Sequence, residues 1–222
     1  MNIRDFIVRI IFTVSLSVPV LTQAEIIGGI EFPDGALSFA DLVVSYDPLA
    51  GGGPAPTDPN FLTPQEALGV PDYVSPIGSV SLGRGGTIIL QFTDNRLTGS
   101  DDPTPDLHIF EIGPQVEDTF VAISQNGTDW VEIGKVFGAT SSIDIDQFGF
   151  GTDDEFSFVR LIDDFNEGGA TGATVGADID AVGAISTVAA PVPVPAALPL
   201  FGFGMMWLAR ASRRKHFEKW PT

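Results

Sequence analysis

The stretch "VAISQNGTDWVEIG", Val121–Gly134, places an Asn-Gly pair between two runs rich in β-branched and other apolar residues. Asn126 and Gly127 suit a tight turn because both tolerate a positive φ angle. The stretch therefore predicts a β-hairpin. The sequence on either side of it decides whether the hairpin belongs to a larger sheet.

Short runs of the same kind recur on both sides of this hairpin at regular spacing. In "EFSFVRLID", Glu155–Asp163, apolar and polar residues alternate, with Phe156 and Phe158 on one face, as in a strand with one buried and one wet face. Short strands separated by turn residues predict an all-β fold, a jelly roll or β-sandwich. The expected strands are Ser79–Gly83, Thr87–Phe92, Asp106–Ile112, Thr119–Ser124, Trp130–Phe137, Ser142–Asp146, Glu155–Asp163 and Asp178–Ser186.

One short helix is expected among these strands, near Pro64–Leu68. Thr63 can cap its first turn, and Glu66, three residues later, can complete a capping box. Proline is favoured at the first helical position, and Gly69 can end the helix. The sequence predicts no other helix between residues 25 and 188.

The composition excludes several classes of function. The 222 residues include no cysteine, so disulfides, thiolate nucleophiles and cysteine-based zinc sites are ruled out. The net charge of −18 argues against nucleic acid as a partner, because phosphate binding needs a basic surface. Between residues 25 and 188 four basic residues face 27 acidic ones, a difference of −23, whereas both ends of the chain are basic. Basic ends around an acidic middle are typical of a chain whose ends are read by membrane machinery.

The first 24 residues have the layout of a secretory signal peptide. A weakly basic start, "MNIRDFIVR", precedes the apolar run Ile10–Leu21, and "LTQA" offers a small residue, Ala24, before a cleavage point. The alternative is a buried N-terminal helix. Residues 25–188 are then one exported β-sandwich domain, which depends on packing, and on metal where it binds one, in place of disulfides.

Residues 189–222 form a Pro-rich linker, an apolar run and a basic end. The stretch Val192–Ala209 carries no charge and is long enough for a marginal membrane span. Its prolines disfavour a regular helix in the first half. The positive-inside rule places the basic end in the cytoplasm and the acidic domain outside. The basic residues here are Arg210, Arg213, Arg214, Lys215 and Lys219.

Nothing in the chain selects a catalytic group. His108 is the only histidine between residues 25 and 188, and no G-x-S-x-G motif accompanies it. Alternation in "DLHIFEI" sets it opposite Leu107 and Ile109, so we expect it on the surface or at a strand edge. Carboxylates are numerous, but no pair of them is selected as in a glycosidase. We therefore expect no enzyme, with a hydrolase as the least favoured alternative.

The loop "TDNRLTGSDDPTPD", Thr93–Asp106, gathers acidic and amide side chains between two expected strands. Calcium takes six to eight oxygen ligands, which carboxylates, amides and backbone carbonyls supply. The loop lacks the spacing of an EF-hand, and a solvated acidic loop is the alternative. The candidate calcium ligands are Asp94, Asn95, Asp101, Asp102 and Asp106, with Asp178 and Asp180 from a later strand.

The middle of the chain also resembles a known family. "S-x-N-G-x-x-W-x-x-I-G", Ser124–Gly134, resembles a hairpin of galactose-binding-like jelly rolls, and "ALGVPDY", "VSLGRGGTIILQFTDN", "DLHIFEIG" and "GADIDAVGAI" resemble a β-sandwich of bacterial exported surface proteins. The resemblance covers Phe39–Ile185. It implies a structural calcium at one end of the sandwich, and sugar binding through exposed aromatic residues. The candidates for sugar binding are Tyr46, Phe61, Tyr73 and Trp130, with a core position as the alternative for Trp130.

The tail resembles the PEP-CTERM class of bacterial sorting signals, in which a proline motif, an apolar span and a basic end follow one another. "VPVPAALPLF" is similar to the VPLPA variant, with Val194 where that variant has leucine. The resemblance implies recognition by an exosortase-type membrane protease, a transient single-pass stay in the inner membrane, and release to the cell surface or outside. It also implies a non-catalytic role in an exopolysaccharide or biofilm matrix, with a carbohydrate-binding, lectin-like module as the alternative. The sorting residues are Val192, Pro193, Val194, Pro195, Ala196, Arg213 and Arg214.

Overall fold

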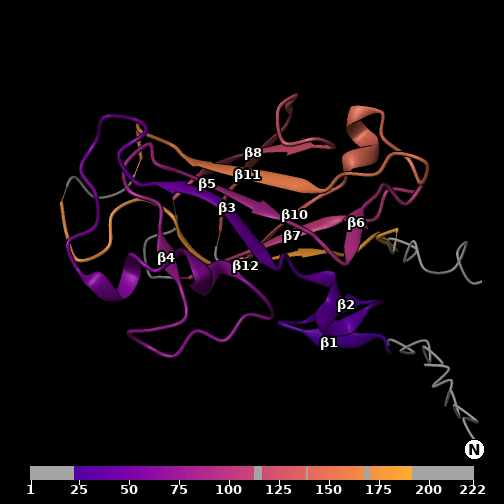
Figure 1. Ribbon diagram of the computed structural model, residues 1–222, viewed down its shortest axis with the longest axis horizontal. Helices are drawn as coiled ribbons and strands as arrows, with labels where there is room; N and C mark the ends of the chain where they lie inside the picture. The colour runs from indigo at the N-terminus through magenta and orange to yellow at the C-terminus, as the bar shows by residue number, and fades with distance from the viewer. Residues whose placement is uncertain (1–22, 113–116, 139, 168–170, 192–222) are drawn as a thin grey trace, which may run out of the picture.

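The computed structural model describes residues 23–112, 117–138, 140–167 and 171–191. Two larger antiparallel sheets form a β-sandwich there, and two small two-stranded ribbons lie beside them (Figure 1). Within the described residues no helix is long and apolar enough to cross a membrane. Except for its last two residues, the expected signal peptide lies outside the described residues, and the sorting motif and apolar span lie wholly outside them.

The larger sheet has five strands in the order β3-β5-β11-β8-β9, each antiparallel to its neighbours. Along the central strand, β11, partly exposed and buried residues alternate without a break. This is the alternation expected of a strand with one face on the core and one toward solvent. The strands are β3 (Leu42–Asp47), β5 (Thr87–Gln91), β11 (Phe158–Asp163), β8 (Thr119–Ser124) and β9 (Val131–Val136).

The smaller sheet has four antiparallel strands in the order β10-β7-β12-β4. Every residue of its two central strands, β7 and β12, is buried, so this sheet is covered on both faces. Its strands are β10 (Thr140–Ile143), β7 (Leu107–Glu111), β12 (Asp178–Ala184) and β4 (Val80–Ser81).

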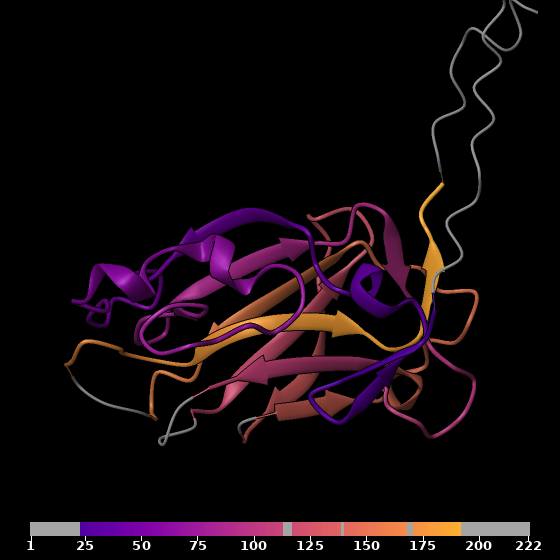
Figure 2. The same cartoon turned by 90° about the horizontal axis from the view of Figure 1, so that it is seen from below.

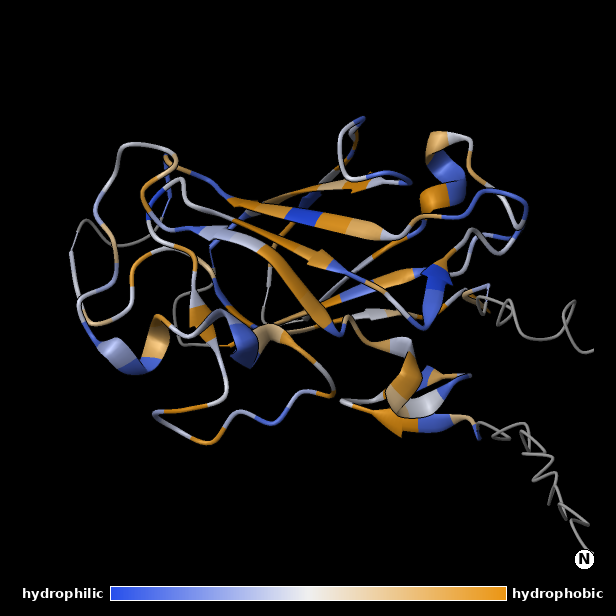
Figure 3. Ribbon diagram, in the orientation of Figure 1, coloured by the Kyte–Doolittle hydropathy of each residue, from blue (hydrophilic) through white to orange (hydrophobic). Residues whose placement is uncertain are grey.

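Apolar side chains from the facing sides of the two sheets make the main core. The strands of both sheets are largely hydrophobic along their length (Figure 3), and the core members occupy alternate positions on them. Burying one such side chain contributes about 1.5–3 kcal/mol. Fully buried members include Ile88, Leu90, Val121, Ile123, Val159 and Leu161 of the larger sheet, and Val80, Leu107, Ile109, Ile179 and Val182 of the smaller one.

The N-terminal segment covers the outer face of the four-stranded sheet. It consists of the β1–β2 hairpin (Glu25–Ile27 and Ile30–Phe32) and the 3-10 turn η1 (Gly35–Ser38), seen beside the sheet in Figures 1 and 2. Phe32 and a second ring from this segment, Phe39, pack with Phe110 and Ala181 in a second small core.

This cover also explains the position of His108, which is 2% exposed, contrary to the expected surface position. Its ring lies edge-on to that of Phe110, with centroids 4.6 Å apart, and its Nδ1 is 2.5 Å from the Ser142 hydroxyl. Burial lowers the pKa of His108 to about 4. Alternation alone places the side chain on the outer face of its sheet but does not reveal that a distant segment covers that face.

Helical structure in the described residues is limited to short 3-10 turns. They are η1, η2 (Pro59–Phe61), η3 (Pro64–Ala67) and η4 (Ile145–Phe148). The expected helix is present as η3, but only as one 3-10 turn, and the Thr63 side chain does not cap it. Leu68 is already extended, so the segment ends before an α-helical turn can close.

Several expected strands are shorter in the structure: β4 covers only Val80–Ser81 and β11 begins at Phe158. In two further places a side chain accounts for the difference. β8 and β9 form the predicted hairpin, but residues 125–130 connect them, and the Asn126 side chain accepts hydrogen bonds from the backbone N–H groups of Thr128 and Asp129, both at 2.9 Å. The strand expected over Ser142–Asp146 ends as β10 at Ile143, because the Asp144 side chain starts η4. In each case a side chain bonds the backbone locally in place of a strand partner.

The described chain ends in a small ribbon. β13 (Thr187–Ala189) pairs antiparallel with β6 (Asn95–Leu97). This ribbon lies directly before the residues of the expected sorting tail, which start at Val192.

Candidate metal centre

Three carboxylates converge where the loop after β6 meets the turn after β10. Asp106 directly precedes β7, Asp144 caps η4, and Asp146 lies in its first turn. One carboxylate oxygen from each lies within 4.8 Å of the others. The antiparallel pairing of β7 with β10, in which Ile143 lies opposite Leu107, brings these distant parts of the sequence together.

Asp106 is fully buried, and only part of its carboxylate is satisfied. Oδ2 accepts a hydrogen bond of 2.9 Å from the backbone N–H of Ile145. Oδ1 is buried with no hydrogen-bond partner among the described residues. Burial raises the pKa of Asp106, and the nearby Ser186 hydroxyl offsets this in part, although no described hydroxyl lies in hydrogen-bonding geometry to Oδ1. A buried carboxylate oxygen without a donor is costly unless a ligand satisfies it.

The other two carboxylates are oriented by short local hydrogen bonds. Asp144 Oδ1 accepts from the Asp146 N–H at 3.0 Å. Asp146 Oδ2 accepts from the Ser100 N–H at 2.9 Å, and its Oδ1 accepts from the Asp101 N–H at 3.1 Å. These bonds fix the positions of the carboxylates, but none of the four salt bridges in the described part of the chain gives them a cation.

An open surface hollow of about 420 Å³ is lined by two of the three carboxylates, those of Asp144 and Asp146, whereas the buried Asp106 does not line it. At its rim, Asp101 has a φ of 60° and accepts a hydrogen bond of 2.6 Å from the Thr152 hydroxyl. The Thr104 hydroxyl lowers the pKa of Asp102. The hollow is lined by Asp101, Asp102, Pro103, Asp144, Asp146 and Gln147.

This donor set fits a hard divalent cation. Carboxylate and amide oxygens are the ligands that calcium and magnesium prefer, and the chain has no cysteine thiolate that would favour a softer metal ion. The open hollow leaves room for the water molecules that complete such a coordination shell. The unpartnered Oδ1 of Asp106 is the observation that distinguishes this cluster from an ordinary acidic surface loop.

The structure brings together only some of the calcium ligands expected from sequence. Asp101 and Asp102 line the hollow and Asp106 belongs to the cluster, whereas Asp94 and Asn95 belong to neither. The pKa of Asp94 is raised by burial and by the nearby charge of Asp41, and the Asn95 amide donates to the Thr187 hydroxyl at 3.0 Å.

Asp178 and Asp180 lie on β12 and have partners of their own. Asp178 accepts a hydrogen bond from the Ser81 hydroxyl, and Asp180 accepts one of 3.0 Å from the Asp72 N–H. Neither belongs to the converging carboxylates.

Asp144 and Asp146 are the cluster members that sequence reasoning missed. Both lie in "SIDIDQF", which was expected to be a strand as far as Asp146. The available signal was Asp144 itself, because an aspartate that follows apolar strand residues is a favoured cap for a helical turn. A strand predicted to end before Asp144 would have placed the carboxylates of Asp144 and Asp146 in a turn next to the acidic loop.

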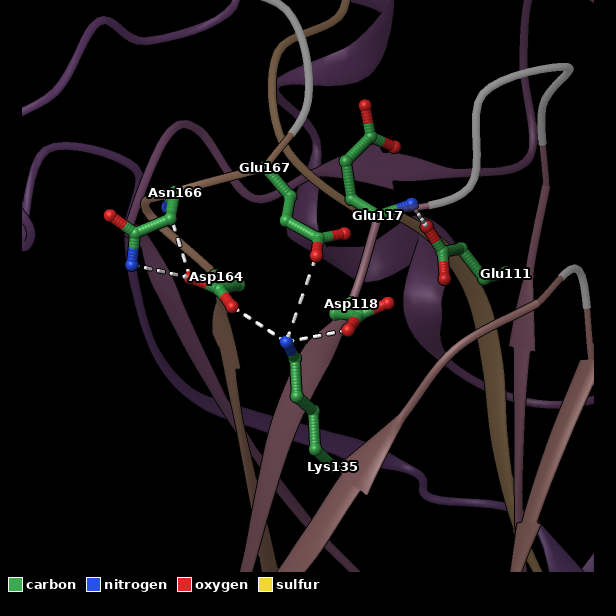
Figure 4. A network of polar contacts seen from close by, with 7 residues as sticks. All are labelled: Glu111, Glu117, Asp118, Lys135, Asp164, Asn166 and Glu167. Atoms are coloured by element: carbon green, nitrogen blue, oxygen red, sulfur yellow. Dashed lines mark hydrogen bonds and ion pairs between the residues drawn. The ribbon is translucent and has the colours of Figure 1, made fainter.

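A second acidic group differs from this centre because it contains its own cation (Figure 4). Lys135 Nζ lies 2.5 Å from Asp118, 2.6 Å from Asp164 and 3.9 Å from Glu167. The two carboxylate hydrogen bonds raise the pKa of Lys135, which keeps the ammonium charged. This network is an ion-pair cluster, in which the ammonium takes the place that a metal ion would need.

Two buried glutamates adjoin this network (Figure 4). The Glu117 N–H donates to Glu111 Oε1 at 3.1 Å. Burial is the first cause that raises the pKa of Glu111 to about 8 and that of Glu117 to about 7, and the charges of Asp163 and Asp178 add to it.

The aromatic residues expected to bind sugar have different environments. Phe61 is 7% exposed and belongs to the interior, which removes it as a stacking surface. The Tyr46 hydroxyl donates to the Ser81 carbonyl at 2.6 Å. Trp130 is partly exposed, and the Arg160 guanidinium lies 4.6 Å from the centre of its ring.

No family model and no curated protein matches this chain. Among solved structures it is similar to the C-terminal domain of a chitobiase from Bacteroides fragilis. The TM-score is 0.40 and the sequence identity 13%, over 71% of this chain and 98% of that one. Similarity at this level identifies neither a family nor a function.

Proposed function

We propose that the chain is an exported, non-catalytic protein of the cell surface or extracellular matrix, sorted through its C-terminal tail. The observation that carries this proposal is the order of features after β13: a proline motif, an uncharged run and a basic end. The N-terminal basic and apolar runs support export. The partners are then an exosortase-type membrane protease, the inner membrane during sorting, and exopolysaccharide outside the cell.

The proposal includes a finer description of the chain. The sandwich is a jelly roll of the galactose-binding-like kind, residues 1–24 are a removable signal peptide, and residues 189–222 are a linker, a membrane-spanning sorting helix and a basic end. Calcium is the proposed structural cofactor, held at the three carboxylates of Asp106, Asp144 and Asp146.

Mass spectrometry of the surface or secreted form tests the sorting role. We expect an N-terminus at Glu25 and a new C-terminus near Pro195. A variant with Arg213→Glu and Arg214→Glu should retain the full tail, because the reversed charges oppose retention of that end in the cytoplasm. An unmodified end at Thr222 in the surface form of the natural chain would contradict the proposal.

A second candidate is a carbohydrate-binding module, which the outer face of the five-stranded sheet favours. Phe158, Arg160 and Ile162 alternate with buried residues on β11, and on the neighbouring strand β8 Phe120 is 40% exposed. Trp130 stacks with Arg160 on this face. Exposed aromatic rings on the face of a sheet provide stacking surfaces for sugar rings.

Binding to insoluble polysaccharide tests this second candidate. Trp130→Ala should reduce the bound fraction at least several-fold, because it removes a stacking ring without touching the core. Ile26→Ala is the matched control, since Ile26 is 74% exposed on the N-terminal hairpin. Equal binding of both variants and the natural chain would contradict the carbohydrate-binding candidate and leave the matrix role unaffected.

A further inference from the structure

Asp106 connects the carboxylate cluster to the segment that leads into the tail. Its backbone carbonyl accepts hydrogen bonds from the N–H groups of Ile185, at 2.6 Å, and Ser186, at 3.2 Å. Its own N–H donates to the Ile143 carbonyl at 2.8 Å. The residue that carries the unpartnered buried oxygen therefore also holds the chain immediately before β13.

The segment that follows Ser186, residues 187–190, is held by few other interactions. The Thr98 N–H donates to the Ser186 carbonyl at 3.0 Å, and the Ala190 N–H donates to the Asp94 carbonyl at 2.8 Å. Between them lies the three-residue pairing of β13 with β6. A two-stranded ribbon of this size has little stability of its own, so its order depends on how firmly the β6–β7 loop is fixed.

Charge decides how firmly that loop is fixed. Asp106 lies at the end of the loop, Asp144 caps η4 and Asp146 lies in its first turn, so like charges on these three carboxylates would disfavour contact between the loop and the turn. The hydrogen bonds from Ser100 and Asp101 to Asp146 oppose this repulsion but carry no formal charge. A divalent cation would reverse the sign of the interaction and satisfy Oδ1 of Asp106.

We propose that a divalent cation of the calcium class binds the carboxylates of Asp106, Asp144 and Asp146 and thereby clamps β13, the strand that leads into the C-terminal tail. Cation occupancy then controls how far the base of the tail can separate from the sandwich. The inference rests on the calcium cofactor of the proposed function and adds a role to it, namely that the tail is presented from an ordered base only in the bound state.

Hydrogen exchange of the full chain, followed by mass spectrometry, tests the clamp. Exchange of the amides of residues 185–190 is compared in chelator, in calcium alone and in magnesium alone. If opening of β13 releases the ion, exchange should slow in proportion to the calcium concentration, about 100-fold at 100 times the dissociation constant. The N–H groups of Ile185 and Ser186 should show the largest effect, because Asp106 accepts both.

Matched variants separate the centre from general charge effects. Asp146→Asn should abolish the calcium effect, with Asp144→Asn as a second variant at the same centre. Glu31→Gln, which removes an exposed carboxylate on the N-terminal hairpin, should respond to calcium as the natural chain does. The comparison of the natural chain with and without calcium does not depend on the folding of any variant.

The outcomes distinguish the inference from the function on which it rests. Calorimetry that detects no binding of calcium or magnesium would overturn both the cation cofactor and the clamp. Binding with unchanged exchange at residues 185–190 would overturn the clamp and keep the cofactor. An equal response of Asp146→Asn and the natural chain would also overturn the clamp, because the ion would then lie elsewhere. The sorting role is tested separately by the C-terminus of the surface form.

Discussion

At the scale of single residues, Lys135 holds together carboxylates that would otherwise repel one another. Its ammonium contacts Asp118 and Asp164, whose side chains are 22% and 10% exposed. The ammonium contact with Asp164 is the first cause that lowers the pKa of that carboxyl. This three-residue ion-pair network contributes more to folding stability than an isolated surface ion pair, because two carboxylates share one partly shielded ammonium.

Lys135→Met keeps the length of the side chain and removes its charge. We expect a lower midpoint of thermal unfolding, because Asp118 and Asp164 then face each other without a counter-ion. Glu132→Gln is the control: Glu132 pairs with Arg160 but is 60% exposed, so its loss should change stability by at most about 1 kcal/mol. A Lys135→Met protein that melts like the Glu132→Gln protein would show that the network adds no stability.

Leu161 tests the packing between the two sheets. It is fully buried on β11, and Leu161→Ala should lower the free energy of unfolding by about 2–5 kcal/mol, through lost burial and the cavity left behind. Urea unfolding measures the change. Ile26→Ala, at a position 74% exposed, should have little effect, and equal losses for both variants would contradict the assigned core.

At the scale of elements, the ends of three strands place buried acids close together. Glu111 ends β7, Asp163 ends β11 and Asp178 begins β12. Burial, first among the causes, raises the pKa of Asp163 and of Asp178 to about 6. Arg84 is the basic residue that opposes this effect at Asp163.

These raised values predict that stability falls as the pH rises. A carboxyl with a higher pKa in the folded than in the unfolded state binds its proton more tightly when folded. Its contribution is complete below the unfolded value, about 4, and is lost through the folded values, about 6 for Asp163 and Asp178, 7 for Glu117 and 8 for Glu111.

Unfolding midpoints measured between about pH 5 and pH 9 check this. Glu111→Gln should flatten the decline above pH 7, since the amide cannot ionise. His108 acts in the opposite direction, because its pKa in the folded state, about 4, lies below the usual pKa of histidine. Stability therefore falls as the pH drops below that usual pKa. The difference between the natural chain and Glu111→Gln isolates the glutamate, and parallel pH curves would contradict its assignment.

The elements also show what the sequence could predict. Alternation in "FVRLID" and "LHIFE" predicted two central strands, because their facing sides lie on the main core. It could not predict that β1, β2 and η1 cover the outer side of β7, since that contact joins parts of the chain far apart in sequence. Local propensity also failed where Asp144 bonds the backbone and ends β10.

The candidate centre was predictable in part for the same reason. Asp101, Asp102 and Asp106 lie in one acidic loop, so composition identified them. Asp144 and Asp146 reach the same place only through the pairing of β7 with β10. Asp94 is close in sequence, but the chain carries its carboxylate toward Asp41. Calcium binding itself stays a prediction.

At the scale of the whole molecule, calcium should raise the stability of the sandwich. Ligand that binds only the folded state adds about 2.7 kcal/mol at 100 times its dissociation constant. The thermal midpoint should therefore rise with calcium concentration and return after addition of chelator. Asp106→Asn should remove this dependence while Glu31→Gln keeps it, and a midpoint that ignores calcium in the natural chain would contradict the cofactor.

The positions of the two chain ends give the sandwich a sidedness. β1, the first described strand, and β6, which pairs with the last strand β13, lie toward the same end of its long axis, and the Gly-rich loop after β3 lies at the other (Figures 1 and 2). During its transient stay in the inner membrane, a sandwich tethered by its tail would therefore stand upright, with that loop as the surface farthest from the membrane. Because the chain has no cysteine, a cysteine introduced at Ala50 can be labelled alone in spheroplasts that retain the tail, and it should react with a membrane-impermeant maleimide faster than one introduced at Glu25.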